Sequence, residues 1–181
     1  LADTKIGFAA SAINALEYYG VESNKKIVSF CDTTPDGEGT RPLIRMLADH
    51  FGYEVVYEPE LLPGQSDFST QINQAKNTGA DILMGMMLPG DGWSMWRQSE
   101  TYDWNPNFAA VFKTAEPSEW WTELGETGEG VTHLMFWHAA LPWPGTQEIA
   151  DTWEDETGEM WSLHLGDGAA IMQVLANAIE R

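Results

Sequence analysis

Four segments of the chain combine polar or aromatic side chains with glycine or proline, the mixture that small-molecule pockets use. They span residues 32–39, 87–93, 113–118 and 138–143, and each follows a stretch that reads as a β-strand. Ligands of open parallel sheets bind beyond the carboxyl ends of the strands, so these segments are candidates for one binding site. Leu88, Trp93 and Trp143, the last in a rigid Pro-Trp-Pro loop, are candidates for its apolar wall.

Other kinds of site find little support in these segments. Residues 36–40 lack the Gly-Lys-Ser/Thr ending of a phosphate-binding loop, and two carboxylates stand where the anion would lie. His133 and His138, five residues apart, would point to opposite faces of a continuing strand and could not share a metal ion. Cys31 lies in an apolar strand, where we expect an inert buried thiol. The chain is therefore expected not to be an enzyme and to hold neither metal nor cofactor.

The composition excludes further classes of partner. The chain has 181 residues, 43% of them hydrophobic, and a formal net charge of −19. So negative a surface repels nucleic acid and anionic lipid, and no apolar run is long enough to insert into a membrane. The acids are scattered along the chain, which favours adaptation to salt over a local cation site. The start at Leu1 suggests a processed or excised piece, and the single cysteine fits a reducing compartment or an exported domain.

Hydrophobic periodicity and Gly/Pro breaks predict the elements that position these segments. Strands are expected at 27–31, 53–57, 82–87, 108–112 and 131–137. Helices are expected at 9–19, 43–51, from an N-cap at Ser66 or Asp67 to Gly79, from Trp93 onward, and at 117–124, 146–156 and 168–179, with turns at 32–39 and 89–92. The alternation predicts an α/β fold with an open, mostly parallel sheet flanked by helices on both faces.

The last two helices have no strand between them, so the chain is expected to divide into an α/β lobe, residues 1–145, and C-terminal helices, residues 146–181. These helices either cover the lobe or return toward a part of the protein outside this chain. Most of the nine tryptophans are expected to pack in the core.

The order of several short sequence segments resembles that in the second lobe of type I periplasmic solute-binding proteins, the leucine/isoleucine/valine-binding group that serves ABC importers. The segments are Lys26 to Phe30, Asp32 to Gly39, Gly64 to Ser69, Gly79 to Leu83 and Trp96 to Gln98. The ending, Asp167 to Glu180, is similar to the helix that returns toward the first lobe. The resemblance implies a receptor, periplasmic or extracellular, that closes two lobes around an amino acid or similar small polar metabolite. Its partners would be ABC permease subunits and an N-terminal lobe that precedes Leu1.

The resemblance also implies that the loops matching Asp36, Leu88 to Gly90 and Lys113 to Glu116 each contribute a residue that contacts the solute. The ligand-binding candidates are Thr33, Asp36, Leu88, Trp93, Lys113, Thr114, Glu116 and Trp143. Asp36 stands where the family often has an aromatic residue, and Lys113 or Thr114 where an acid is expected, with Glu116 close by. A solute with an anionic or hydrogen-bond-accepting group, such as an acidic amino acid, an amide or a urea-like compound, is therefore as compatible as leucine.

Two other hypotheses stay open on the sequence. One is a flavodoxin-like α/β enzyme or phosphotransfer domain that uses Asp32 and Asp36 with a metal ion. The other is the ligand-sensing domain of a signalling receptor, which would share the architecture.

Overall fold

A computed structural model describes residues 4–116 and 118–180 and divides the chain into two compact units. The first unit covers residues 1–134 and the second residues 135–181. Among the described residues, no helix combines the length and the apolar character needed to cross a bilayer.

The first unit is built on a five-stranded parallel sheet in the order β2-β1-β3-β4-β5. Its strands are β1 (Lys26–Cys31), β2 (Glu54–Tyr57), β3 (Ile82–Met86), β4 (Phe108–Phe112) and β5 (Val131–Thr132). Cys31 pairs with Met86, and Met86 pairs with Phe112, so the three central strands end in register at one edge. The predicted α/β fold with a parallel sheet is confirmed.

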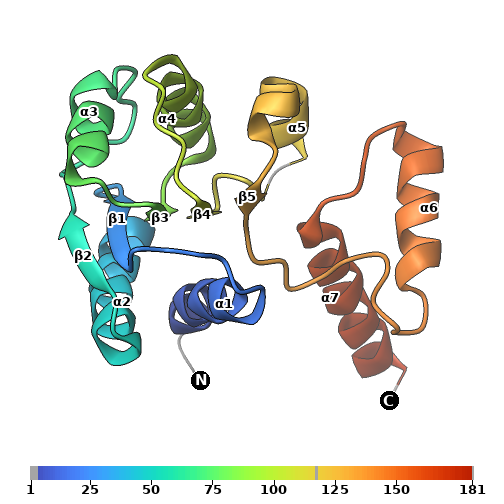
Figure 1. The fold of residues 1–181 in the computed structure, drawn as a ribbon. Coiled ribbons are helices and arrows are strands. Elements are labelled where there is room, and N and C mark those ends of the chain that lie inside the picture. The colour runs from blue at the N-terminus through green and yellow to red at the C-terminus, as the bar shows by residue number, and fades with distance from the viewer. Residues whose placement is uncertain (1–3, 117, 181) are drawn as a thin grey trace. The chain divides into compact units, whose positions relative to one another are not determined.

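Helices cover both faces of this sheet (Figure 1). They are α1 (Thr4–Tyr18) and α2 (Pro35–Phe51) on one face, and α3 (Ser69–Thr78), α4 (Pro89–Thr101) and α5 (Glu119–Leu124) on the other. Each face has its own core, because successive strand residues point to opposite sides: Ile27 packs with α1 and α2, whereas Val28 packs with α3 and α4. A 3-10 turn, η1 (Gly125–Gly128), follows α5.

Two predicted turns are the first turns of helices. Residues 35–39 belong to α2 and residues 89–92 to α4. Each helix starts with proline at its first position, where the missing N–H costs no intrahelical hydrogen bond. The Thr34 side chain caps α2 by accepting the Gly37 N–H. The glycines of both segments suggested turns. In the structure, Gly37 and Gly92 are small because Asp32 and Thr114 pack closely against them.

Other boundaries also differ from the predictions, among them the start of α1, which lies at Thr4 and not at residue 9. β5 ends at Thr132 and not at Trp137, because it pairs only with Ala109 and Ala110 of β4 before the chain leaves for the second unit. The argument that a continuing strand separates His133 from His138 therefore loses its premise. The N-cap of α3 is Phe68 and neither Ser66 nor Asp67, although the Asp67 carboxylate accepts the Ser69 N–H at 2.9 Å. α5 starts at Glu119, and Pro117 lies outside the described residues.

The second unit contains two helices, α6 (Thr146–Thr157) and α7 (Leu163–Ile179). Its small core holds Trp137, Ala139 and Ala150, with Trp161 packed against them. α7 begins five residues earlier than predicted. Its Gly166 lies against the Trp137 ring, where a Cβ atom would come within 2.1 Å, so this glycine permits packing and does not break the helix.

Candidate functional site

The loop after β1 is joined to the loop after β3 through the side chain of Asp32. This carboxylate is 1% exposed, and its Oδ2 accepts the Leu88 N–H at 2.9 Å. Its Oδ1 accepts both the N–H and the hydroxyl of Thr34. Gly37 lies so close that a Cβ atom there would be 2.2 Å from the Asp32 carbonyl oxygen. Asp32 is thus a buried tie between two loops, with both carboxylate oxygens accepting hydrogen bonds.

The loop after β4 is joined to the same structure by Thr114. Its side chain is fully buried, and its hydroxyl donates to the Met87 carbonyl at 3.1 Å. The Thr114 carbonyl accepts the indole N–H of Trp93 at 2.9 Å. Gly92, in the first turn of α4, packs directly on the Thr114 side chain. The buried Asp32 carboxylate and the buried Thr114 hydroxyl are both hydrogen-bonded to a neighbouring loop, so the three loops form one rigid edge.

Two charged side chains meet at this edge. The Lys113 Nζ lies 2.9 Å from the Asp36 Oδ2, which brings the loop after β4 to the first turn of α2. The two side chains are 36% and 46% exposed, so the pair is accessible to solvent. The Glu116 Oε1 accepts the Lys113 backbone N–H at 3.3 Å. This edge, comprising Asp36, Leu88, Trp93, Lys113, Thr114 and Glu116, is called the rim below.

The structure thus brings six of the eight candidate residues together. Thr33 follows Asp32 at the same edge, half-buried, and its N–H donates to the Leu61 carbonyl at 2.9 Å. Trp143 belongs to the second unit, where its side chain is exposed. Sequence reasoning missed Thr34 and Gly92, which shape the rim. A threonine directly before proline at a helix start was the available signal for the Thr34 cap.

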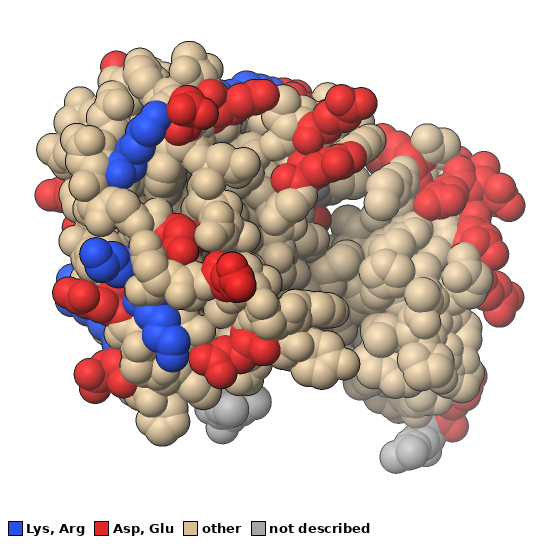
Figure 2. All heavy atoms as spheres, viewed as in Figure 1, with Lys and Arg blue, Asp and Glu red and all other residues tan. Residues whose placement is uncertain are grey.

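The groups that could support chemistry are few. In the described part of the chain, no cluster of three or more His, Cys, Asp or Glu side chains is arranged to hold a metal ion. Cys31 is fully buried, and this burial raises the pKa of its thiol to about 11, so it carries little thiolate at neutral pH. Burial also disfavours the charged form of His133, which for a histidine lowers the pKa. Figure 2 shows acidic side chains spread over the visible surface, not gathered in one place.

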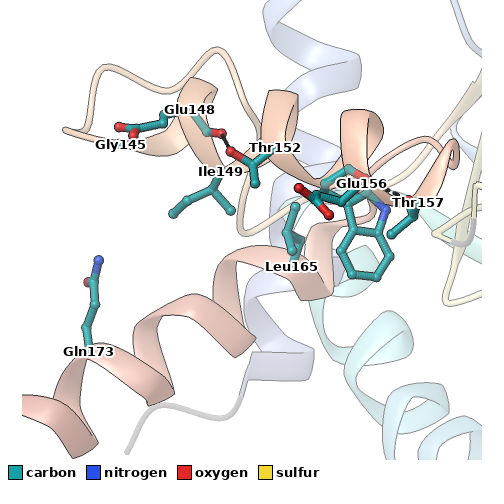
Figure 3. A pocket seen from close by; sticks show the side chains of 9 residues that line it. Gly145, Glu148, Ile149, Thr152, Glu156, Thr157, Leu165 and Gln173 are labelled. Carbon is teal, nitrogen blue, oxygen red and sulfur yellow. Dashed lines mark hydrogen bonds between the residues drawn. The ribbon is translucent and has the colours of Figure 1, made fainter.

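The second unit has a hollow of its own, of about 610 Å³, between α6 and α7. Figure 3 shows Glu148, Ile149 and Thr152 on α6 and Leu165 and Gln173 on α7 around it. The hydroxyl of Thr152 donates to a backbone carbonyl of its own helix. None of the residues that line this hollow is a candidate from the sequence.

Solved structures of solute-binding proteins share this fold. Leucine-binding protein LivK from Thermotoga maritima is 21% identical with a TM-score of 0.80, over 96% of this chain and 49% of that one. LivJ from Streptococcus pneumoniae, solved with isoleucine, is 14% identical with a TM-score of 0.82, over 96% and 49%. A solute-binding protein from R. palustris, solved with benzoate, is 12% identical with a TM-score of 0.80, over 94% and 46%. The chain thus spans about half the length of these proteins.

No curated protein sequence matches the chain. The model of a protein family described as periplasmic binding protein matches residues 7–181, which include the whole rim and the second unit. The match agrees with the expectation of a binding protein and not an enzyme, and the fold matches one lobe of the solved solute-binding proteins. The chain belongs to the periplasmic binding protein family.

Proposed function

We propose that the chain supplies one lobe of the extracytoplasmic solute-binding component of an ABC importer, which binds an amino acid or similar small polar metabolite between two lobes. The observation that carries the proposal is the rim. Three strand-end loops are locked together by buried hydrogen bonds, and they leave the Asp36–Lys113 pair accessible at the edge where ligands of parallel sheets bind. The solutes of LivK, LivJ and the R. palustris protein support this class of ligand.

A second lobe is part of the proposal, and the surface of α7 supports it. Five apolar side chains of this helix are more than half exposed: Ile171, Met172, Val174, Leu175 and Ile179. A helix that is apolar on most sides is normally buried, and so large an apolar surface normally meets another protein surface. We assign that role to an N-terminal lobe, as the half-length match to the solved structures suggests.

Binding would proceed by closure of the two lobes, with the solute stabilising the closed state through the additional contacts made there. One lobe alone makes only part of these contacts. Isothermal titration calorimetry with L-isoleucine, L-glutamate and benzoate should therefore detect binding to the natural gene product that contains this chain. Residues 1–181 alone should bind the same solute with an affinity at least about 100-fold weaker. A micromolar dissociation constant for residues 1–181 alone would contradict the two-lobe proposal.

Delivery to ABC permease subunits, from a periplasmic or extracellular location, is the second part of the proposal. The loaded natural protein should stimulate ATP hydrolysis by its permease in proteoliposomes. Solute binding without any stimulation would favour the alternative of a ligand-sensing domain.

A further inference from the structure

We propose that Lys113 determines solute specificity by binding a carboxylate at the end of the solute that faces this lobe. The inference rests on the proposed solute-binding function and names the class of solute that the rim selects. Three observations carry it: the backbone conformation of Lys113, its ion pair with Asp36, and its position relative to the other cations of the chain.

The backbone at Lys113 adopts a conformation that lysine rarely takes. Its φ is +63°, and the Thr114 N–H donates to the Phe112 carbonyl at 2.7 Å, which closes a three-residue γ-turn of the strained kind. Such a turn persists only where its surroundings fix it, and strained backbone is concentrated at ligand-binding positions. Here the surroundings are the hydrogen bonds of buried Thr114 to Met87 and Trp93. The fold therefore maintains an unfavourable turn whose central residue is a cation.

The ammonium group of Lys113 is held in place yet open to a further partner. It has three N–H donors, and its bond to Asp36 uses one, so a solute carboxylate can bind without displacing Asp36. Asp36 lies in the first turn of α2, where the helix dipole favours a carboxylate. An ion pair this exposed contributes little to stability. We therefore assign it the role of holding the Lys113 ammonium group in position within the rim.

The other lysines and arginines whose side chains the structure describes are less available to a solute at the rim. Lys25 and Lys26 precede or begin β1, at the opposite edge of the sheet. Three others pair with acids away from the rim: Arg45 with Glu58, Lys76 with Asp103 and Arg97 with Glu123. Arg41 reaches the same edge, where it donates to the Cys31 carbonyl at 2.6 Å, but its side chain is only 17% exposed and lies 3.7 Å from Glu38. Among the described side chains of a chain of net charge −19, Lys113 is therefore the cation of the rim that is accessible to a solute.

The α4 helix adds to the preference for an anion. The N–H groups of Gly90 and Asp91 in its first turn have no partner within the helix and give this end a partial positive charge, whereas the Gly92 N–H donates to the Leu88 carbonyl at 2.9 Å. The Asp91 carboxylate, in the same turn, accepts the Gly64 N–H at 2.8 Å. Gly92 of this turn packs on Thr114, so the end of α4 lies beside Lys113. A carboxylate near Lys113 would meet both positive features, whereas a neutral amide would gain less from either.

The test compares solutes that differ only in charge at one end. Calorimetry on the natural protein would use L-glutamate with L-glutamine, benzoate with benzamide, and L-isoleucine as a further solute, on wild type, Lys113→Gln and Lys76→Gln. Lys76 is the matched control, because it is also partly exposed and paired with an aspartate, 3.3 Å away. We expect one or both carboxylates to bind more tightly than the matched amide, and Lys113→Gln to weaken that binding by about tenfold or more. Lys76→Gln should leave it unchanged.

The outcomes separate this inference from the proposed function. If the amides or L-isoleucine bind as well as the carboxylates, or if Lys113→Gln binds carboxylates like wild type, the specificity assigned to Lys113 is wrong while solute binding stands. If none of the five compounds binds the wild-type protein, both proposals fail. Circular dichroism and unfolding of the unliganded variants establish that each is folded.

Discussion

The tight contact between Gly92 and Thr114 allows a quantitative test of how the rim is built. A Cβ atom on Gly92 would lie 2.2 Å from the Thr114 Cγ2 and 2.6 Å from its Oγ1, far inside van der Waals contact. Thr114 cannot move aside easily, since it is fully buried and hydrogen-bonded to Met87. Overpacking of this kind costs about 1–3 kcal/mol, and the better helix propensity of alanine returns up to about 1 kcal/mol. Gly92→Ala should therefore lower the free energy of unfolding by about 1–2 kcal/mol.

Gly90 supplies the matched control two residues earlier in the same helix turn. A Cβ atom at Gly90 meets nothing within 4 Å, so Gly90→Ala should be neutral or slightly stabilising. Urea denaturation of both variants measures the difference, and thermal unfolding should place Gly92→Ala about 2–8 °C below wild type. Equal unfolding midpoints for the two variants would show that the packing at Thr114 is looser than described, and the argument for a rigid rim would fail with it.

Asp32→Asn keeps the shape of the side chain but replaces one acceptor oxygen by a donor that faces Thr34 or Leu88, so the free energy of unfolding should fall by about 1–3 kcal/mol in urea titrations. A variant as stable as wild type would remove Asp32 from its role as a tie. The Cys31 thiol has a pKa of about 11 when folded against 9.0 for the free group, so its contribution to stability is complete below about pH 9 and is lost as the pH rises toward 11. Wild type should therefore lose about 2–3 kcal/mol more than Cys31→Ala between pH 8 and 11, and parallel pH profiles would contradict this. Lys113→Gly should relieve the strained turn and leave the free energy of unfolding, measured by urea titration, unchanged or raised by up to about 1 kcal/mol. A clear loss of stability would mean that the ion pair with Asp36 outweighs the strain.

The parallel sheet was predictable because its signals are local. The buried strands are short apolar runs. The helix ends expected at residue 51 and at Gly79 are confirmed by left-handed backbone at Gly52 and Gly79, with φ of 74° and 67°. Glycine is the residue that enters this conformation without steric cost. Local chemistry therefore fixed both the helix ends and the alternation of elements.

The helix starts were not predictable from the same residues. Gly37 and Gly92 read as turn residues, but each is small because other atoms pack closely against it: the Asp32 backbone of the preceding loop in one case and the Thr114 side chain of the loop after β4 in the other. The contact of Gly92 with Thr114 joins two different loops, so no local pattern encodes it. The strained turn at Lys113 is hidden for the same reason, since the groups that fix it come from β3 and α4.

The hydrogen bonds of the rim also explain why this edge favours binding over metal-assisted phosphoryl transfer. A catalytic carboxylate must offer oxygen atoms to a metal ion, but those of Asp32 are buried and already accept three hydrogen bonds from Leu88 and Thr34. Recruiting them would leave backbone N–H groups without partners in the interior. Asp36 and Lys113, by contrast, are accessible and paired with each other, which suits a solute that arrives and leaves. The buried acid keeps the loops in place, and the exposed pair is where we propose that the solute is recognised.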